Sequence, residues 1–162
     1  MNRLREGAPE EDIQQLETEL GYHLPETIRA SLHIHNGASD FVDAWELLDL
    51  RSILHAHQEQ REVLHWLQET DDKPDWWWRP QWIPLAQDGG GNLLCVDSAS
   101  EGDTQVGQII LFDHEVGSGP IASSFHTFFS SLADHFEAGK YTIDEWGTLS
   151  SEVPWEKHFL SR

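Results

Sequence analysis

The sequence predicts a single domain of helices and strands that is organised around one β-hairpin. Its 162 residues are enough for one hydrophobic core, because a chain of this size buries roughly two thirds of the surface that its unfolded form exposes. Residues 82–97 consist of two apolar runs on either side of a turn, which is the pattern of a hairpin. Several other stretches repeat apolar residues at helical spacing, and no internal repeat divides the chain.

The hairpin turn has the sequence Asp88-Gly89-Gly90-Gly91-Asn92. Its glycines allow positive φ angles that a side chain would disfavour, and the side chains of Asp88 and Asn92 can hydrogen-bond the amides of the turn. The second apolar run, Leu93–Val96, contains no polar residue. We therefore expect it to form a strand that is covered on both faces and lies in the centre of its sheet.

Two short helices are predicted near the N-terminus. The first starts just after Gly7 with acidic residues in its first turn, and Gly21 ends it. Its inward stripe consists of Ile13, Leu16 and Leu20. The second helix starts at Leu24-Pro25-Glu26 and ends at Asn36-Gly37. The short connection between the two predicts that they pack as a corner.

A third and longer helix is predicted over residues 50–67, where apolar residues keep helical spacing. Asp49 precedes it as a plausible N-cap, and a polar loop over residues 69–75 follows it. Residues 41–48 are predicted to form a short strand or an ordered loop, with Trp45 as its anchor.

The segments after the hairpin alternate between polar connections and apolar elements. In order, we expect an acidic connection over 98–107, a strand over 108–112, a loop over 114–120, a helix over 123–136, a short strand over 141–147 and an irregular tail over 148–162. Gly139 ends the helix, and Trp155 and Phe159 give the tail two side chains that can dock on the domain.

The chain is strongly acidic, with 10 Lys and Arg against 29 Asp and Glu and a formal net charge of −19. Neither Lys nor Arg occurs between Arg79 and Lys140, so one half of the protein should project a negative field. Such a field disfavours nucleic acid, anionic membranes and phosphate-rich ligands, and it speeds encounter with a basic protein. The alternative is that the acidic surface serves solubility alone.

The single cysteine, Cys95, lies in the apolar strand of the hairpin, so no disulfide can form within the chain. This favours a reducing compartment. Residues 1–30 carry acidic residues throughout and lack a continuous apolar run, which predicts neither a signal peptide nor a membrane span. We therefore expect a cytoplasmic protein.

The histidines suggest a metal site only at first sight. His33 and His35 are two residues apart, as are His55 and His57, and side chains two apart on a helix point to different sides. No cluster of Cys and His has the spacing of metal ligands, so we expect neither a metal nor a cofactor. Cys95 has no CxxC partner and is expected to be a packed thiol rather than a nucleophile.

An acid/base site is the remaining catalytic alternative, as in a small hydrolase or transferase. It would require Asp88, Asp97, Asp113 and His114 to meet near the ends of strands. The glycine turn is not a phosphate cradle, because it lacks the Lys and the Ser or Thr of a P-loop. We predict no catalytic residues.

A surface that binds another protein is the more promising interpretation. Three consecutive tryptophans, residues 76–78, cannot all face one side of an extended segment, so at least one should stay partly exposed as an interface anchor. The alternative is that they fold back over a sheet edge. The predicted contact residues are Trp76, Trp77, Trp78, Asp88, Asp97, Glu101, Asp103, Asp113 and Glu115.

The order of these motifs resembles the SUKH superfamily, the Smi/Knr family of cell-wall regulators and immunity proteins. The resemblance rests on Gly-Ala-x-Glu-Glu-x-Ile-x-x-Leu-Glu from Gly7 to Glu17, on Leu-Pro-x-x-x-Arg from Leu24 to Arg29, and on Asn36-Gly37. The segments 82–92, 107–109 and 124–125 continue it. It covers residues 4–146, whereas the tryptophan run and the tail over 147–162 lie outside the pattern.

The resemblance implies one α+β domain over residues 1–162, with a twisted, mainly antiparallel sheet and helices packed on it. It also implies a non-enzymatic binding protein. Our first hypothesis is a bacterial immunity protein that neutralises a basic toxin domain, such as a nuclease. The alternative is a regulatory scaffold for cell-wall synthesis or signalling, with several weaker partners.

Overall fold

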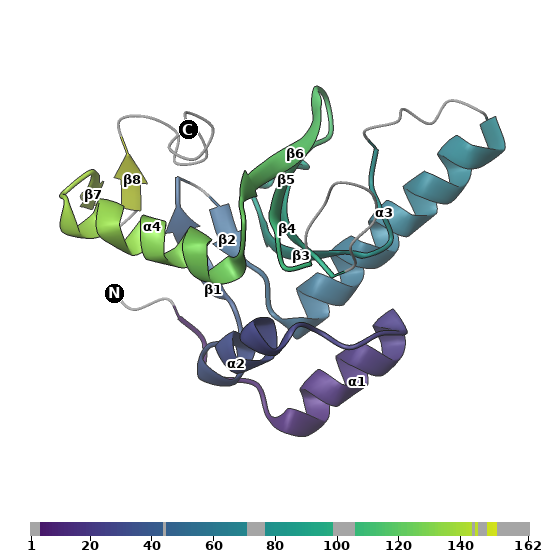
Figure 1. The fold of residues 1–162 in the computed structure, drawn as a ribbon, viewed down its shortest axis with the longest axis horizontal. Coiled ribbons are helices and arrows are strands. Elements are labelled where there is room, and N and C mark those ends of the chain that lie inside the picture. Colours follow the sequence, from purple (N-terminus) through teal and green to yellow (C-terminus); the bar gives the residue numbers. More distant parts are fainter. Residues whose placement is uncertain are drawn as a thin grey trace.

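The computed structural model describes residues 4–43, 45–70, 77–98, 106–143, 145 and 149–151. Within these ranges, four helices and eight strands follow one another along the chain (Figure 1). In order they are α1 (Glu10–Leu20), α2 (Glu26–Ile34), β1 (Ala38–Val42), β2 (Trp45–Leu47), α3 (Leu50–Thr70), β3 (Trp82–Gln87), β4 (Leu93–Asp97), β5 (Ile109–Asp113), β6 (Gly117–Ala122), α4 (Phe125–Glu137), β7 (Tyr141–Ile143) and β8 (Leu149–Ser151).

The sheet is an antiparallel meander in which strands β1 to β6 pair in chain order, while β7 and β8 form a separate pair. The predicted hairpin is confirmed: Trp82 pairs with Asp97 and Gln87 pairs with Leu93. All five residues of β4 are buried, so the expectation of a strand covered on both faces is confirmed as well. The fold is α+β, as the family resemblance implied.

The helices pack around this sheet from different sides. In Figure 1, α1 and α2 lie below the sheet and α4 lies to its left. Helix α3 contacts both α1 and β3, whereas α4 contacts β6 and α2. One continuous core joins these layers and includes residues of α1, α2, α3, α4 and every strand of the large sheet.

Aromatic rings fill the core between α3 and the sheet. Trp78 is 1% exposed and meets the rings of His57, Trp82 and Phe112 edge to face, with centroids 6.0, 5.8 and 5.7 Å away. His57 Nε2 lies 2.8 Å from the carbonyl oxygen of Pro80. Burial lowers the pKa of His57, so this imidazole acts as a neutral, packed ring rather than as a surface charge.

Two predicted helix boundaries have clear local causes. Gly21 follows α1 in the left-handed conformation, with φ at 86°, and its N–H donates to the carbonyl of Glu17. Asp49 is the N-cap of α3, because its Oδ1 accepts a hydrogen bond of 2.8 Å from the N–H of Ser52. Asn36 also serves α3: its Oδ1 accepts from the N–H of Leu50 at 2.9 Å.

Two sequence predictions were wrong. Residues 117–120, expected in a loop, belong to the edge strand β6, where Gly119 pairs with Leu111. Their Gly-Ser-Gly-Pro composition is typical of a turn, but small residues and a proline are acceptable on an edge whose outer N–H groups need no partner. Residues 149–151, expected in an irregular tail, form β8, and Asp43 accepts hydrogen bonds from both the N–H and the hydroxyl of Ser151.

The segments 71–76, 99–105 and 152–162 lie outside the described residues. The predictions for the polar loop after α3, for most of the acidic connection and for Trp155 and Phe159 fall there. Among the described helices, none combines the length and the apolar composition that a membrane crossing requires.

Candidate interaction surfaces

The glycine turn between β3 and β4 is held by its own side chains. Oδ1 of Asp88 accepts hydrogen bonds from the N–H groups of Gly90 and Asn92, at 2.8 and 3.1 Å, and Nδ2 of Asn92 donates to Oδ2 at 2.8 Å. Both carboxylate oxygens of Asp88 therefore accept hydrogen bonds that stabilise the turn. Asp88 is partly buried and shapes the turn instead of projecting freely from it.

The neighbouring turn between β5 and β6 is tied to this one through Asn92. Its Oδ1 lies 3.0 Å from Nδ1 of His114 and accepts from the backbone N–H of the same residue at 3.3 Å. Oδ1 of Asp113 accepts from the N–H groups of Glu115 and Val116. The structure thus brings Asp88, Asp113 and His114 to one end of the sheet.

Asp97 does not join them. It lies at the opposite end of β4, paired with Trp82, and is 1% exposed. The acid/base alternative required these side chains to converge, and Asp97 is separated from the others by the length of the strand. Its burial also removes Asp97 from the candidate contact surface.

The tryptophan run is divided between core and partial exposure. Trp78 is a core residue, so it is removed from the predicted contact residues. Trp77 is half-buried and packs edge to face on Phe112, with ring centroids 5.2 Å apart. Trp76, Glu101 and Asp103 lie outside the described residues. Glu115 is well exposed, with 78% of its side chain accessible.

The histidines and the cysteine occupy structural positions. His33 and His35 point to different carbonyl oxygens, those of Ala8 and Arg5. Within the described ranges, no three His, Cys, Asp or Glu side chains gather as metal ligands would. Burial raises the pKa of the Cys95 thiol well above its usual value, so it stays protonated in the core.

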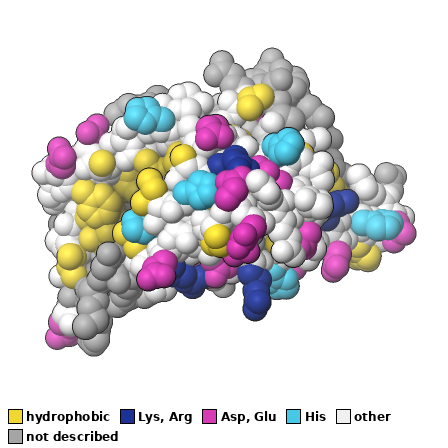
Figure 2. Space-filling view, turned by 90° about the horizontal axis from the view of Figure 1, so that it is seen from below, with side chains coloured by type: hydrophobic (Ala, Val, Ile, Leu, Met, Phe, Trp, Pro, Cys, Tyr) yellow, Lys and Arg dark blue, Asp and Glu magenta, His cyan; other side chains and the backbone are white. Residues whose placement is uncertain are grey.

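An open apolar surface lies between α2 and α4, where residues of both helices line a groove of about 560 Å³. Ile34 on its wall is 67% exposed. Figure 2 shows hydrophobic side chains gathered at the left of the lower face, the side on which α4 lies in Figure 1. The groove is lined by Thr27, Ala30, Ser31, Ile34, Phe125, His126, Phe129, Ser130 and Ala133.

The sequence pattern alone does not predict this groove. Ile34 is two residues beyond the inward-facing Leu32, which places it on another side of α2. Phe125 and Phe129 fit the apolar stripe of α4, but both are only half-buried. The sequence did carry one sign of the groove: α4 has more apolar residues than its contact with the core requires.

A second exposed apolar site lies on α3. Val63 and Trp66 are 39% and 57% exposed, and their spacing places them on one side of the helix. Neither residue stands out from the sequence, because Leu64 and Leu67 already satisfy the helical pattern of apolar residues. The groove between α2 and α4 combines residues of two helices and is the stronger candidate.

Comparison with known proteins places the chain in a family. Residues 7–131 match the model of the SMI1 / KNR4 family (SUKH-1). The chain belongs to this family. It is similar to the glucan synthesis regulatory protein of Neurospora crassa (28% identity over 89% of this chain and 36% of the relative) and to the cell wall biosynthesis/cell cycle regulator smi1 of Schizosaccharomyces pombe (30% over 86% and 33%). The chain therefore spans about a third of these two relatives.

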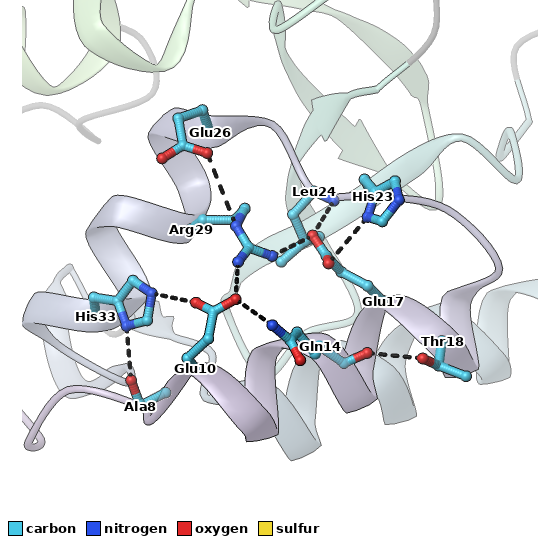
Figure 3. A network of polar contacts seen from close by, with 10 residues as sticks. All are labelled: Ala8, Glu10, Gln14, Glu17, Thr18, His23, Leu24, Glu26, Arg29 and His33. Carbon is cyan, nitrogen blue, oxygen red and sulfur yellow. Dashed lines mark hydrogen bonds and ion pairs between the residues drawn. The ribbon is translucent and has the colours of Figure 1, made fainter.

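The N-terminal motifs of this SMI1/KNR4 domain form an ion-pair network between α1 and α2. Figure 3 shows Arg29 of α2 between the carboxylates of Glu10 and Glu17 of α1. Nη1 of Arg29 lies 2.7 Å from Oε1 of Glu17, which also accepts from the N–H of Leu24 at 2.9 Å. Glu10 lies 2.9 Å from Nε2 of His33 as well. These motif residues fix the corner between the two helices.

Glu17 makes the network sensitive to acid. It is 6% exposed. Burial alone would raise the pKa of Glu17, but the hydrogen bonds from Arg29, His23 and the Leu24 N–H outweigh burial and lower it below the usual value. A carboxyl whose pKa is lower in the folded chain adds stability above its unfolded pKa and loses it as the pH falls through the folded pKa.

We therefore expect Glu17→Gln to reduce the free energy of unfolding at pH 7 by about 1 to 2 kcal/mol, because Gln accepts weaker hydrogen bonds from a cation. The difference from the unmodified domain should shrink as the pH falls below the ordinary carboxyl range. Urea unfolding at several pH values measures both effects. Glu11→Gln, an exposed change on the same helix, is the control, and an equal effect of both substitutions would refute the role of Glu17.

Proposed function

We propose that this SMI1/KNR4 domain is a non-enzymatic regulatory module that acts by binding other proteins, in the manner of a scaffold for cell-wall synthesis. The supporting observation is the similarity of nearly the whole chain to two fungal proteins that are named as regulators of glucan synthesis and of cell-wall biosynthesis. The described residues add an open apolar groove.

The relatives favour this role over toxin immunity, which the family resemblance also implied. Both are fungal and both are named as regulators. The acidic charge that suggested a basic toxin suits a scaffold equally well, since a net charge of −19 favours basic protein partners over nucleic acid or anionic membranes. The buried, unpaired Cys95 supports a cytoplasmic setting for these interactions.

A domain replacement in fission yeast tests this proposal. The part of the smi1 regulator that aligns with this chain would be exchanged for it, and growth would be measured in the presence of a glucan-synthesis inhibitor. We expect growth close to that of the parent strain when the unmodified domain is inserted. When the inserted domain carries Gly7→Ala, a substitution expected to destabilise its fold, we expect growth like that of a smi1 deletion strain. If the unmodified domain is folded and abundant but growth still matches the deletion, the regulatory proposal fails.

A further inference from the structure

The groove between α2 and α4 has an apolar floor that the domain's own side chains leave open. Ile34 and Phe129 come from different helices and face the same space. A second cavity of about 40 Å³ lies beneath α2 and α4 and shares Ser31, Phe125 and Phe129 with the groove. The packing between α2 and α4 is therefore incomplete on this side, and a large apolar side chain has room against it.

The ends of the groove are acidic. On α4, Asp134 follows Ser130 by one turn and Glu137 follows Ala133 by one turn, so both carboxylates continue the groove side of the helix. On α2, Glu26 precedes Ala30 by one turn, and 89% of its side chain is exposed.

The nearby cations neutralise these carboxylates only in part. Nε of Arg29 lies 3.9 Å from Oε2 of Glu26, but the same guanidinium also pairs with Glu10 and Glu17 of α1, as Figure 3 shows. Lys140 follows the end of α4 and is the one cation in residues 80–143. Glu10, Glu17, Glu26, Asp134 and Glu137 make five carboxylates against the two cations Arg29 and Lys140, so the flanking charge is negative.

We propose that this groove binds a basic amphipathic helix of a partner protein. Large apolar residues of that helix pack against Ile34, Phe125 and Phe129, and flanking Lys or Arg side chains meet the acidic ends. An open apolar channel between two helices is suited to a third helix, which can pack its ridges into the existing grooves. This inference rests on the proposed protein-binding function and names the chemistry of the partner.

Charge selects this occupant over a second copy of the domain. Two copies that met through the same groove would bring the same acidic ends together, which is unfavourable. A basic helix gains attraction at both ends, and its association should weaken as salt screens the charges.

A display library tests the proposal with the full chain as bait. The library would hold helical peptides of about 18 residues, long enough for five turns, with large apolar residues fixed at one face and all other positions random. We expect the enriched peptides to carry net positive charge and their affinity to fall about tenfold or more on Ile34→Asn, as for an interface anchor. Ile143→Asn, the same change at a site 73% exposed outside the groove, should alter affinity less than about twofold.

The charges are tested with the best enriched peptide. Asp134→Asn combined with Glu137→Gln should weaken its binding several-fold at low salt and have little effect at high salt. Enriched peptides of net negative charge, equal losses for Ile34→Asn and Ile143→Asn, no enrichment at all, or a dimer of the free chain that Ile34→Asn dissociates would each overturn the inference. The yeast replacement does not depend on this groove, so the regulatory proposal can survive its failure.

Discussion

Gly7→Ala should destabilise the domain by about 3 kcal/mol or more, because it forces a methyl group into backbone. A Cβ atom at Gly7 would lie 1.8 Å from the carbonyl oxygen of His33, a distance that no side-chain rotation can relieve. The start of α1 would have to move away from α2. That movement would break the hydrogen bonds from the Ala8 N–H to the Leu32 carbonyl and from the Asn36 N–H to the Glu6 carbonyl.

Thermal or urea unfolding measures this loss, and Gly119→Ala is the matched control. An added Cβ at Gly119 meets nothing within 4 Å. We expect that variant to stay within about 0.5 kcal/mol of the unmodified domain, as is usual for open surface positions. Equal stability of the Gly7→Ala variant would show that α1 and α2 do not approach as closely as described.

Trp78→Ala should cost about 3 to 5 kcal/mol, the range found when a buried aromatic ring is removed from a core. Trp78 is 1% exposed, and its ring contacts His57 of α3, Trp82 of β3 and Phe112 of β5. Its removal would leave a cavity between the longest helix and the sheet. The exposed aromatic surface that remained would also favour aggregation on heating.

Trp66→Ala makes the same chemical change at a residue that is 57% exposed. We expect this control to cost no more than about 1 kcal/mol, since much less surface is buried there. Comparison of the two variants by urea unfolding separates a core tryptophan from a surface one. A small effect of Trp78→Ala would restore that residue as a possible contact for partners.

Local patterns were sufficient to predict most elements of this fold. The glycine turn, the apolar runs beside it and the helix-ending Gly21 depend on residues close in sequence, and the structure confirms each of them. Strand β6 was missed because its pairing partner β5, and not its own composition, makes it a strand. The short strand β8 likewise exists through its pairing with β7, and Asp43, which is far from it in sequence, accepts two hydrogen bonds from Ser151.

The candidate site was harder to predict, because burial and exposure depend on tertiary packing. The sequence pattern did not reveal that Trp78 packs in the core or that Asp97 is buried at the far end of β4. It also gave no reason to pair Ile34 with Phe129, which are separated along the chain and meet only when α2 and α4 pack together.

The acidic residues have more than one task. Glu17 joins α1 to α2, Asp49 caps α3, and Asp88 and Asp113 hold two turns. These carboxylates are part of the fold, so substituting them would change stability as well as charge. The effect of negative charge on partner binding is better tested at exposed positions such as Asp134 and Glu137. Substituting these two residues leaves the described hydrogen bonds of the turns intact.

The most direct test of the regulatory account is affinity capture of partners from fungal cells with the full chain, at low and high salt, read by mass spectrometry. The account predicts several partners with basic segments that are released as salt rises. Their loss with Ile34→Asn and retention with Ile143→Asn would support the groove inference separately. A single partner that stays bound in high salt and poisons cells when expressed alone would contradict it and support toxin immunity. Capture of no partner by the folded domain would also contradict it.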